Sequence, residues 1–310
     1  MSATATVPSS SPLRGTPARR RNERWIRLVL SGAAAISILI SLLIVLSLIF
    51  QAIAFLRQVD LSQLLAQGWF PRRAMFSLPT VIAGTLIITI VAIAVSTPIG
   101  LASAIYLSEY ASSRVRTVIK PILEILAGIP SVVLGFFALT WISPNIVQAI
   151  FAEAGSATML SAGLGVGILT IPLVASVSED AMRAVPIALR EASYGLGARR
   201  LTTSLRVVAP AAISGIVAAL ILATSRAIGE TMVVALAAGA SAGSLFTLDP
   251  LGPGQTLTGA MASLAAGSDQ VAGATAAFQS LFFLGLVLFL LTLGLNVVGD
   301  AFVRRTRQTY

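Results

Sequence analysis

Long apolar segments constrain this sequence more than any other feature. The first runs from Trp25 to about Leu56 and has no charged residue after Arg27. A helix needs about 20 apolar residues to cross the hydrocarbon core of a bilayer. The segment is too long for the apolar region of a cleaved signal peptide, which has about 7–15 residues. We therefore predict that it is retained as a membrane-spanning helix.

Five later segments have the same apolar character. Soluble domains have about 25% charged residues, whereas this chain of 310 residues is 11% charged and 56% hydrophobic. Pro130 and Pro172 lie inside two of the segments and predict kinks, which neighbouring helices tolerate by binding the freed carbonyl groups. The predicted fold class is an all-α polytopic membrane protein with six transmembrane helices. The five later spans are predicted at residues 78–107, 121–142, 159–177, 208–238 and 274–298.

Cysteine and histidine are both absent from the sequence. Their absence excludes disulfides, thiol catalysis, and zinc or haem sites that depend on these residues. We also expect no cofactor, no catalytic residue and no metal-binding residue.

The basic residues divide the connecting segments into two sets. One set includes both termini and carries most of the arginines. By the positive-inside rule this set is cytoplasmic, and the even number of spans agrees with it. We attribute the net charge of +9 to contact with anionic membrane lipid, not with nucleic acid. The other set, residues 57–77, 143–158 and 239–273, contains only Arg57, Arg72 and Arg73 as basic residues.

These patterns divide the chain into three regions. Residues 1–22 are rich in Ser, Thr, Pro and Arg and predict a disordered basic cytoplasmic tail. Residues 23–77 hold the first transmembrane helix and an external loop, and residues 78–310 hold the main transmembrane domain. Within residues 239–273, which are too rich in Gly and Ser to span, we expect a short helix near Leu257–Ala266.

The segment between the fourth and fifth spans, residues 186–210, predicts a helix–turn–helix at the membrane surface. Pro186 suits the start of a helix, and Gly195 and Gly197 permit a tight turn. A second short helix then leads to Pro210. One interpretation of this segment is a basic amphipathic loop that rests on lipid headgroups. The other is a docking surface for another protein, because its small residues allow close approach.

The spacing in this segment resembles the EAA motif of ABC importer permeases. Glu191-Ala192-Ser193 is followed at the expected distances by Gly197 and by the sequence of residues 207–210. Ser193, Val207 and Ala209 depart from the family pattern, each by a small or apolar exchange. In that family the segment is the coupling helix, which docks on a separate ATPase, and we call residues 186–210 the coupling segment. The resemblance implies an ATPase-coupling role for Arg190, Glu191, Ala192, Ser193, Gly197 and Pro210.

The chain contains no phosphate-binding loop of the Gly-x-x-x-x-Gly-Lys-Ser/Thr type, and its only lysine is Lys120. ATP binding of this kind must therefore come from another polypeptide, and we expect this chain to be a transport subunit and not an enzyme.

Apart from Arg27 near the start of the first span, three charged residues fall within the predicted spans. Arg226 and Glu230 are four residues apart, so a continuous helix would place them on one face. A charge at mid-membrane is costly and usually faces a cavity or a partner. The pair predicts either an anion site on a substrate pathway, with Glu230 balancing the arginine when the pathway is empty, or a structural ion pair. For Glu124 we expect a structural role at the membrane interface.

The amino-acid sequences of several segments resemble those of the permease subunits of the bacterial high-affinity phosphate importer. The segments are Ala127-Gly-Ile-Pro-Ser131, Ala184 to Ala192 and Gly229-Glu-Thr-Met232, and the resemblance covers about residues 78–305. It is closer to the C-type subunit than to its A-type paralogue. It implies a MetI-like type I fold in the bacterial cytoplasmic membrane, and a substrate-pathway role for Arg226 and Glu230.

The same resemblance implies partners: a second permease subunit of the A type, a dimer of the ATP-binding subunit and an external phosphate-binding protein. Three alternatives remain open at this point. The chain could be a permease for another oxyanion such as sulfate or molybdate, a secondary transporter or channel that needs no ATPase, or a membrane scaffold or signalling subunit.

Overall fold

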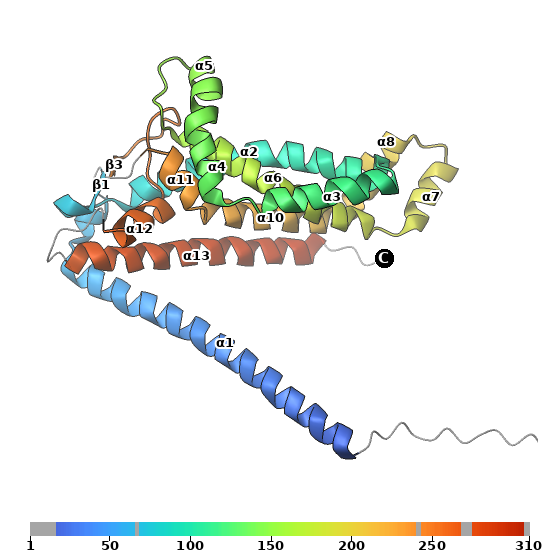
Figure 1. Cartoon of the computed structure of the whole chain (residues 1–310), viewed down its shortest axis with the longest axis horizontal. Helices are drawn as coiled ribbons and strands as arrows, with labels where there is room; N and C mark the ends of the chain where they lie inside the picture. The colour runs from blue at the N-terminus through green and yellow to red at the C-terminus, as the bar shows by residue number, and fades with distance from the viewer. Residues whose placement is uncertain (1–16, 66–67, 240–242, 268–274, 307–310) are drawn as a thin grey trace, which may run out of the picture. The chain divides into compact units, whose positions relative to one another are not determined.

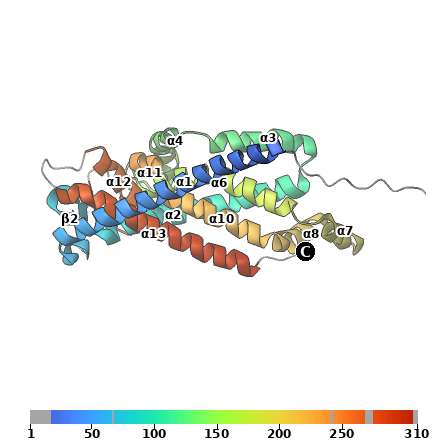
Figure 2. The same cartoon turned by 90° about the horizontal axis from the view of Figure 1, so that it is seen from below.

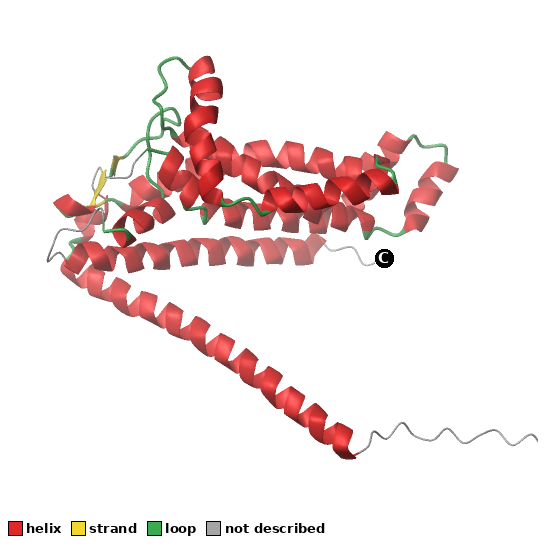
Figure 3. Ribbon diagram, in the orientation of Figure 1, coloured by secondary structure: helices red, strands yellow, loops and turns green. Residues whose placement is uncertain are grey.

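A computed structural model of the chain describes residues 17–65, 68–239, 243–267 and 275–306. Helices form nearly all of the described chain (Figure 3). The chain divides into two units, Met1–Ser47 and Leu48–Tyr310, and helix α1, Pro17–Gln58, begins in the first and ends in the second. Most of the predicted tail, residues 1–16, lies outside the described residues, whereas residues 17–22 already belong to α1.

Among the described residues, five helices are long and apolar enough to cross a membrane, or six if one bent pair counts as a single span. This count agrees with the predicted polytopic helical fold. The bent pair, Arg200–Ala211 and Ile213–Ile228, has an angle of 72° between its parts. The five helices are Glu23–Gln58, Leu78–Tyr110, Ser131–Ile150, Met159–Arg183 and Ala276–Arg305.

The third span differs from its predicted position at 121–142. Helix α3, Ser113–Ala127, ends before a turn, and the spanning helix begins only with α4, Ser131–Phe137. It continues as the π-helix η4, Ala138–Val147, and as α5, Gln148–Ile150. The sequence Gly-Ile-Pro between α3 and α4 breaks the helix, because proline lacks an N–H donor and keeps the residue before it out of the helical region. The proline predicted to kink a helix therefore separates two helices.

The fifth span, predicted at 208–238, is also interrupted. Helix α9, Ala209–Ala211, and α10, Ile213–Ile228, are separated at Ala212. A second break follows at residues 229–231, before the short helix α11, Met232–Ala237. The residues on either side of this second break therefore do not lie on one continuous helix face.

The core of residues 48–306 is built around α2, Leu78–Ile105, and α6, Met159–Arg183, which pack side by side (Figures 1 and 2). Small residues allow this contact. A Cβ atom at Gly100 would lie 2.7 Å from Val174, and one at Gly163 would lie 2.7 Å from Val91. Helix–helix packing in lipid depends on such close approach. Helix α10 contacts α2, α6 and α13, Thr275–Thr306.

One end of the bundle carries a small antiparallel sheet and a short helix. The strand order is β2-β1-β3, and Trp69 of β1 is fully buried against Phe76 of β2. Helix α12, Leu257–Ala265, confirms the short helix predicted in this region. Figure 1 shows the sheet at the opposite end of the bundle from α7 and α8, which belong to the coupling segment. The other elements here are η1, Leu61–Leu65; β1, Gly68–Phe70; η2, Pro71–Arg73; β2, Met75–Phe76; and β3, Ser244–Leu245.

Candidate functional site

The coupling segment folds as the predicted helix–turn–helix. Helix α7, Ile187–Gly195, is followed by a turn and then by a helical stretch made of α8, Arg200–Thr203, the π-helix η5, Ser204–Val208, and α9. Gly197 in the turn has a φ of +78°, a conformation that glycine adopts at little cost. The Ser193 and Thr203 hydroxyl groups are 2.8 Å apart and join the two arms. Ser193 therefore acts inside the segment instead of on its surface.

The outer surface of the coupling segment is open. Glu191, Ala192 and Pro210 are all exposed. Two large apolar side chains of the segment, Ile187 and Leu196, are 69% and 90% exposed. The outer surface of the segment therefore carries both apolar and charged side chains.

Arg190 lies inside the protein, although the sequence analysis assigns it to the residues that couple to the ATPase. Its guanidinium donates to both carboxylate oxygens of Glu109, at 2.9 and 3.4 Å. It also donates to the backbone carbonyl groups of Met182 and Val185, at 2.8 and 2.7 Å. Only 16% of the Arg190 side chain is exposed. The residue therefore fixes α7 to the ends of α2 and α6.

Glu109 belongs to a π-helical turn, η3, Tyr106–Tyr110, that extends α2. Its carboxylate also accepts a hydrogen bond from the Ser108 hydroxyl group, at 2.9 Å. In the same turn the carbonyl group of Leu107 accepts two hydrogen bonds from Arg116 of α3, at 2.7 and 3.0 Å. The π-turn thus presents a carboxylate to α7 and carbonyl groups to α3.

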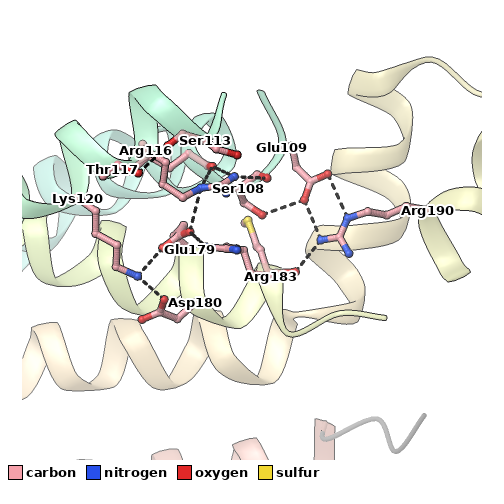
Figure 4. A network of polar contacts seen from close by, with 12 residues as sticks. Ser108, Glu109, Ser113, Arg116, Thr117, Lys120, Glu179, Asp180, Arg183 and Arg190 are labelled. Carbon is pink, nitrogen blue, oxygen red and sulfur yellow. Dashed lines mark hydrogen bonds and ion pairs between the residues drawn. The ribbon is translucent and has the colours of Figure 1, made fainter. Parts of the chain in front are cut away.

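Glu179 of α6 is the most deeply buried charged residue that the structure describes. Lys120 of α3 donates to it at 2.8 Å and to Asp180 at 2.5 Å (Figure 4). Arg116 and Arg183 lie 3.6 and 3.5 Å from the other Glu179 oxygen. Hydrogen bonds to Asp180 and to Glu179 raise the pKa of Lys120 above its usual value.

Sequence reasoning did not single out Glu109 or Glu179 as site residues. Each lies at the end of an apolar segment, where a charge ordinarily meets water or headgroups. Their partners come from other helices, and hydropathy patterns contain no information about that pairing.

The predicted ion pair between Arg226 and Glu230 is not formed. Arg226 is in the last turn of α10, and Glu230 follows the helix end. The Glu230 carboxylate instead accepts hydrogen bonds from the backbone N–H groups of residues 231–233, at 3.2 to 3.4 Å. It therefore caps α11. The Arg226 side chain is exposed, with no hydrogen bond or ion pair to any described residue.

Glu124 is exposed on α3, a helix in which no described residue is buried. It is therefore not a charge buried among the helices of this chain, and its predicted structural role at the membrane interface stays a prediction.

Comparison with known families gives a match over residues 96–308, about two thirds of the chain, to the model described as "Binding-protein-dependent transport system inner membrane component".

Individual relatives give a consistent result. The probable ABC transporter permease protein YqgH of Bacillus subtilis is 37% identical over 58% of this chain and 61% of its own length, so the match spans less than two thirds of that relative. Phosphate transport system permease protein PstC 1 of Mycobacterium tuberculosis is 30% identical over 77% of this chain and 75% of its own. PstA 1 of the same organism is 36% identical over 56% of this chain and 57% of its own.

Solved structures match in fold. A bacterial alginate ABC transporter chain covers 94% of this chain and 98% of its own length with a TM-score of 0.65 and 15% identity. A chain of the inward-facing MetNI methionine ABC transporter covers 73% of this chain and 92% of its own, with a TM-score of 0.52 and 20% identity.

Proposed function

This chain belongs to the family of binding-protein-dependent transport system inner membrane components, and on that premise we propose that it is the permease subunit of an ATP-driven importer of inorganic phosphate. The observation that carries this function is the 30% identity to a phosphate transport permease over 77% of the chain. The MetI-like arrangement of helices agrees with a permease of this class. ATP hydrolysis is proposed to belong to a separate chain, because this sequence has no Gly-x-x-x-x-Gly-Lys-Ser/Thr loop.

The coupling segment is proposed to dock on the ATPase. Glu191 and Ala192 are exposed on α7, and Gly197 lies in the bend that follows it. Leu196, 90% exposed at the tip of that bend, favours burial against a partner. Ser193 and Arg190 contribute differently, because they hold the segment in shape and in place. Pro210 marks the return of the chain toward α10.

Arg226 and Glu230 are proposed to lie on the substrate pathway, but not as an ion pair. An unpaired guanidinium on a membrane helix is costly against lipid, and its planar set of donors matches phosphate oxygens. The exposed Arg226 is thus suited to a polar pathway along the surface that meets the second permease. Glu230 supports this region by capping α11, while its backbone carbonyl accepts a hydrogen bond from Thr258 of α12 at 2.7 Å.

The proposed assembly contains four kinds of subunit: this chain, a second permease of the A type, two copies of an ATP-binding subunit and an external phosphate-binding protein. The similarity of this chain to both PstC 1 and PstA 1 of one organism supports a pair of related permeases. The proposed location is the bacterial cytoplasmic membrane, with both termini and the coupling segment in the cytoplasm, because the basic residues gather on that side.

Uptake by the reconstituted complex tests this function. Proteoliposomes that contain both permeases and the ATPase are supplied with the phosphate-binding protein, and labelled phosphate, sulfate and molybdate are compared with and without ATP. The expected result is ATP-dependent uptake of phosphate alone. Uptake of sulfate or molybdate in preference would assign another oxyanion, and uptake without ATP would indicate a secondary transporter.

A further inference from the structure

Two arginines join the ends of α2 and α6 in a reciprocal way. Arg190 binds carbonyl groups at and just beyond the end of α6, together with the carboxylate of Glu109 at the end of α2. Arg116 binds carbonyl groups at the end of α2 and lies 3.6 Å from the carboxylate of Glu179 in α6. Each guanidinium therefore takes backbone acceptors from one span and a carboxylate from the other (Figure 4).

These contacts are shielded from water. The side chains of Glu109 and Glu179 are 4% and 1% exposed, and those of Arg190 and Arg116 are 16% and 20% exposed. Ion pairs at a protein surface are weak and adjust easily. Hydrogen bonds to charged groups inside a protein are stronger, and removal of one partner leaves a costly buried charge. Arg190 therefore holds the ends of both spans by hydrogen bonds, whereas Arg116 is hydrogen-bonded to the end of α2 and reaches Glu179 of α6 as a buried ion pair at 3.6 Å.

The arginines themselves come from two further elements. Arg190 is part of α7 in the coupling segment, and Arg116 is part of α3. Lys120 adds a second attachment of α3 to α6 through Glu179 and Asp180. If α7 moved with only one of the two spans α2 and α6, Arg190 would lose its hydrogen bonds to the other span. These bonds are kept only if α2, α3, α6 and α7 move together.

We propose that this reciprocal arginine clasp, formed by Arg190 with Glu109 and by Arg116 with Glu179, transmits movement of the coupling segment to α2, α3 and α6. Arg190 is its positioning residue. The clasp rests on the proposed function, since an ATPase must supply the movement. Its role goes beyond docking: the exposed residues of the coupling segment receive the ATPase, and the buried face of the same segment passes the displacement to the spans.

Replacement of Arg190 by lysine tests the clasp. Lysine retains the positive charge but lacks the planar fork that reaches two carbonyl groups and a carboxylate together. Because the chain has no cysteine, spin labels at Ala188→Cys in α7 and Glu124→Cys in α3 report one distance, provided that cysteine-free partner chains are used. The labelled parent complex must first retain ATP-dependent uptake, since Ala188 is exposed on the coupling segment. That distance is measured by double electron–electron resonance in the complete transporter, with and without bound ATP.

For Arg190→Lys we expect the width of the distance distribution to increase at least twofold, because α7 is no longer held to both spans. Phosphate uptake per ATP hydrolysed should fall at least tenfold, while the ATPase still purifies with the permease. Glu109→Leu, which has no side-chain acceptor, removes the same connection from the other side and should give the same two changes. Arg304→Lys, in an exposed pair with Asp300 on α13, is the matched control and should change neither.

Unaltered width and unaltered uptake per ATP in both clasp variants would overturn the proposal. Loss of the ATPase from the purified complex would also overturn it, because Arg190 would then serve folding or docking alone. If the unaltered complex hydrolyses ATP but imports no phosphate, the proposed function fails instead. The distance measurement needs no phosphate and still decides whether the clasp holds α7.

Discussion

Arg226 and Glu230 are four residues apart in the sequence, yet helix α10 ends between them and the glutamate binds the backbone at the start of α11 instead of the arginine. The two charges therefore have separate roles. One is an exposed cation without a described partner, and the other is a helix cap. Substitutions can distinguish these roles.

Arg226→Gln should reduce phosphate uptake at least tenfold while assembly with the ATPase is unchanged. Glutamine keeps some hydrogen-bonding capacity but loses the charge that attracts an anion. Uptake in proteoliposomes and co-purification of the ATPase are the two measurements, with Arg304→Gln as control. Uptake at the normal rate would make Arg226 a structural residue.

Glu230→Ala should destabilise α11 by about 1 kcal/mol, the typical cost of a lost helix cap. Glu230→Gln keeps an oxygen that can accept the same hydrogen bonds, so it should be much less damaging to stability. Thermal unfolding of the purified complex compares the two variants. If glutamine preserves stability but lowers uptake as strongly as alanine, the charge itself contributes to transport.

Glu191→Lys should uncouple ATP hydrolysis from transport, because it reverses the charge on the proposed docking surface of α7. We expect uptake per ATP hydrolysed to fall at least tenfold. Ala188→Ser, an exposed change on the same helix that adds no charge, is the control. Normal coupled uptake by the lysine variant would refute the docking role of Glu191.

Gly197→Ala and Gly195→Ala should have opposite effects on the coupling segment. Neither added Cβ meets another atom within 4 Å, but only Gly197 has a positive φ. Alanine at Gly197 should cost roughly 1–2 kcal/mol, whereas alanine inside α7 at Gly195 should stabilise the helix by about 0.5–1 kcal/mol. Hydrogen exchange of α7 amides should accelerate in the first variant and slow in the second. Equal effects would exclude a conformational role for Gly197.

Lys120→Met should lower the Tm of the complex by the same amount at pH 6 and at pH 9. The pKa of Lys120 is raised above 10.5 by its carboxylate partners. A raised lysine pKa contributes stability that is complete below the unfolded pKa and is lost only as pH rises through the higher folded value. The contribution should therefore decline only above about pH 10.5. A Tm difference that shrinks between pH 6 and pH 9 would contradict the raised pKa.

Hydropathy was sufficient to locate α2, α6 and α13 as candidate membrane spans, because each is one continuous apolar helix. It failed at the third and fifth spans. Proline inside an apolar segment is compatible with a kink or with a full break, and neighbouring helices decide which occurs. At Pro130 the chain starts a new helix. The break at residues 229–231 contains no proline, and there the Glu230 carboxylate binds the backbone N–H groups at the start of α11.

The exposed part of the coupling segment could also be predicted, since its glycine spacing is a local property. Its buried attachments could not. Arg190 and Glu109 are 81 residues apart in the sequence, and only the packing of α2 against α6 brings them together. The sequence therefore placed Arg190 on the docking surface, whereas the structure places it beneath that surface.

The reciprocal clasp has a consequence for comparison of related sequences. Four of its six acceptor groups are backbone carbonyl groups, those of Leu107, Ser108, Met182 and Val185, which any amino acid supplies. Substitution at those positions leaves the hydrogen bonds in place, so covariation between aligned positions would detect only the carboxylate halves, Glu109 with Arg190 and Glu179 with Arg116. The side chains around the clasp can then differ among related sequences while the connection between the spans is preserved.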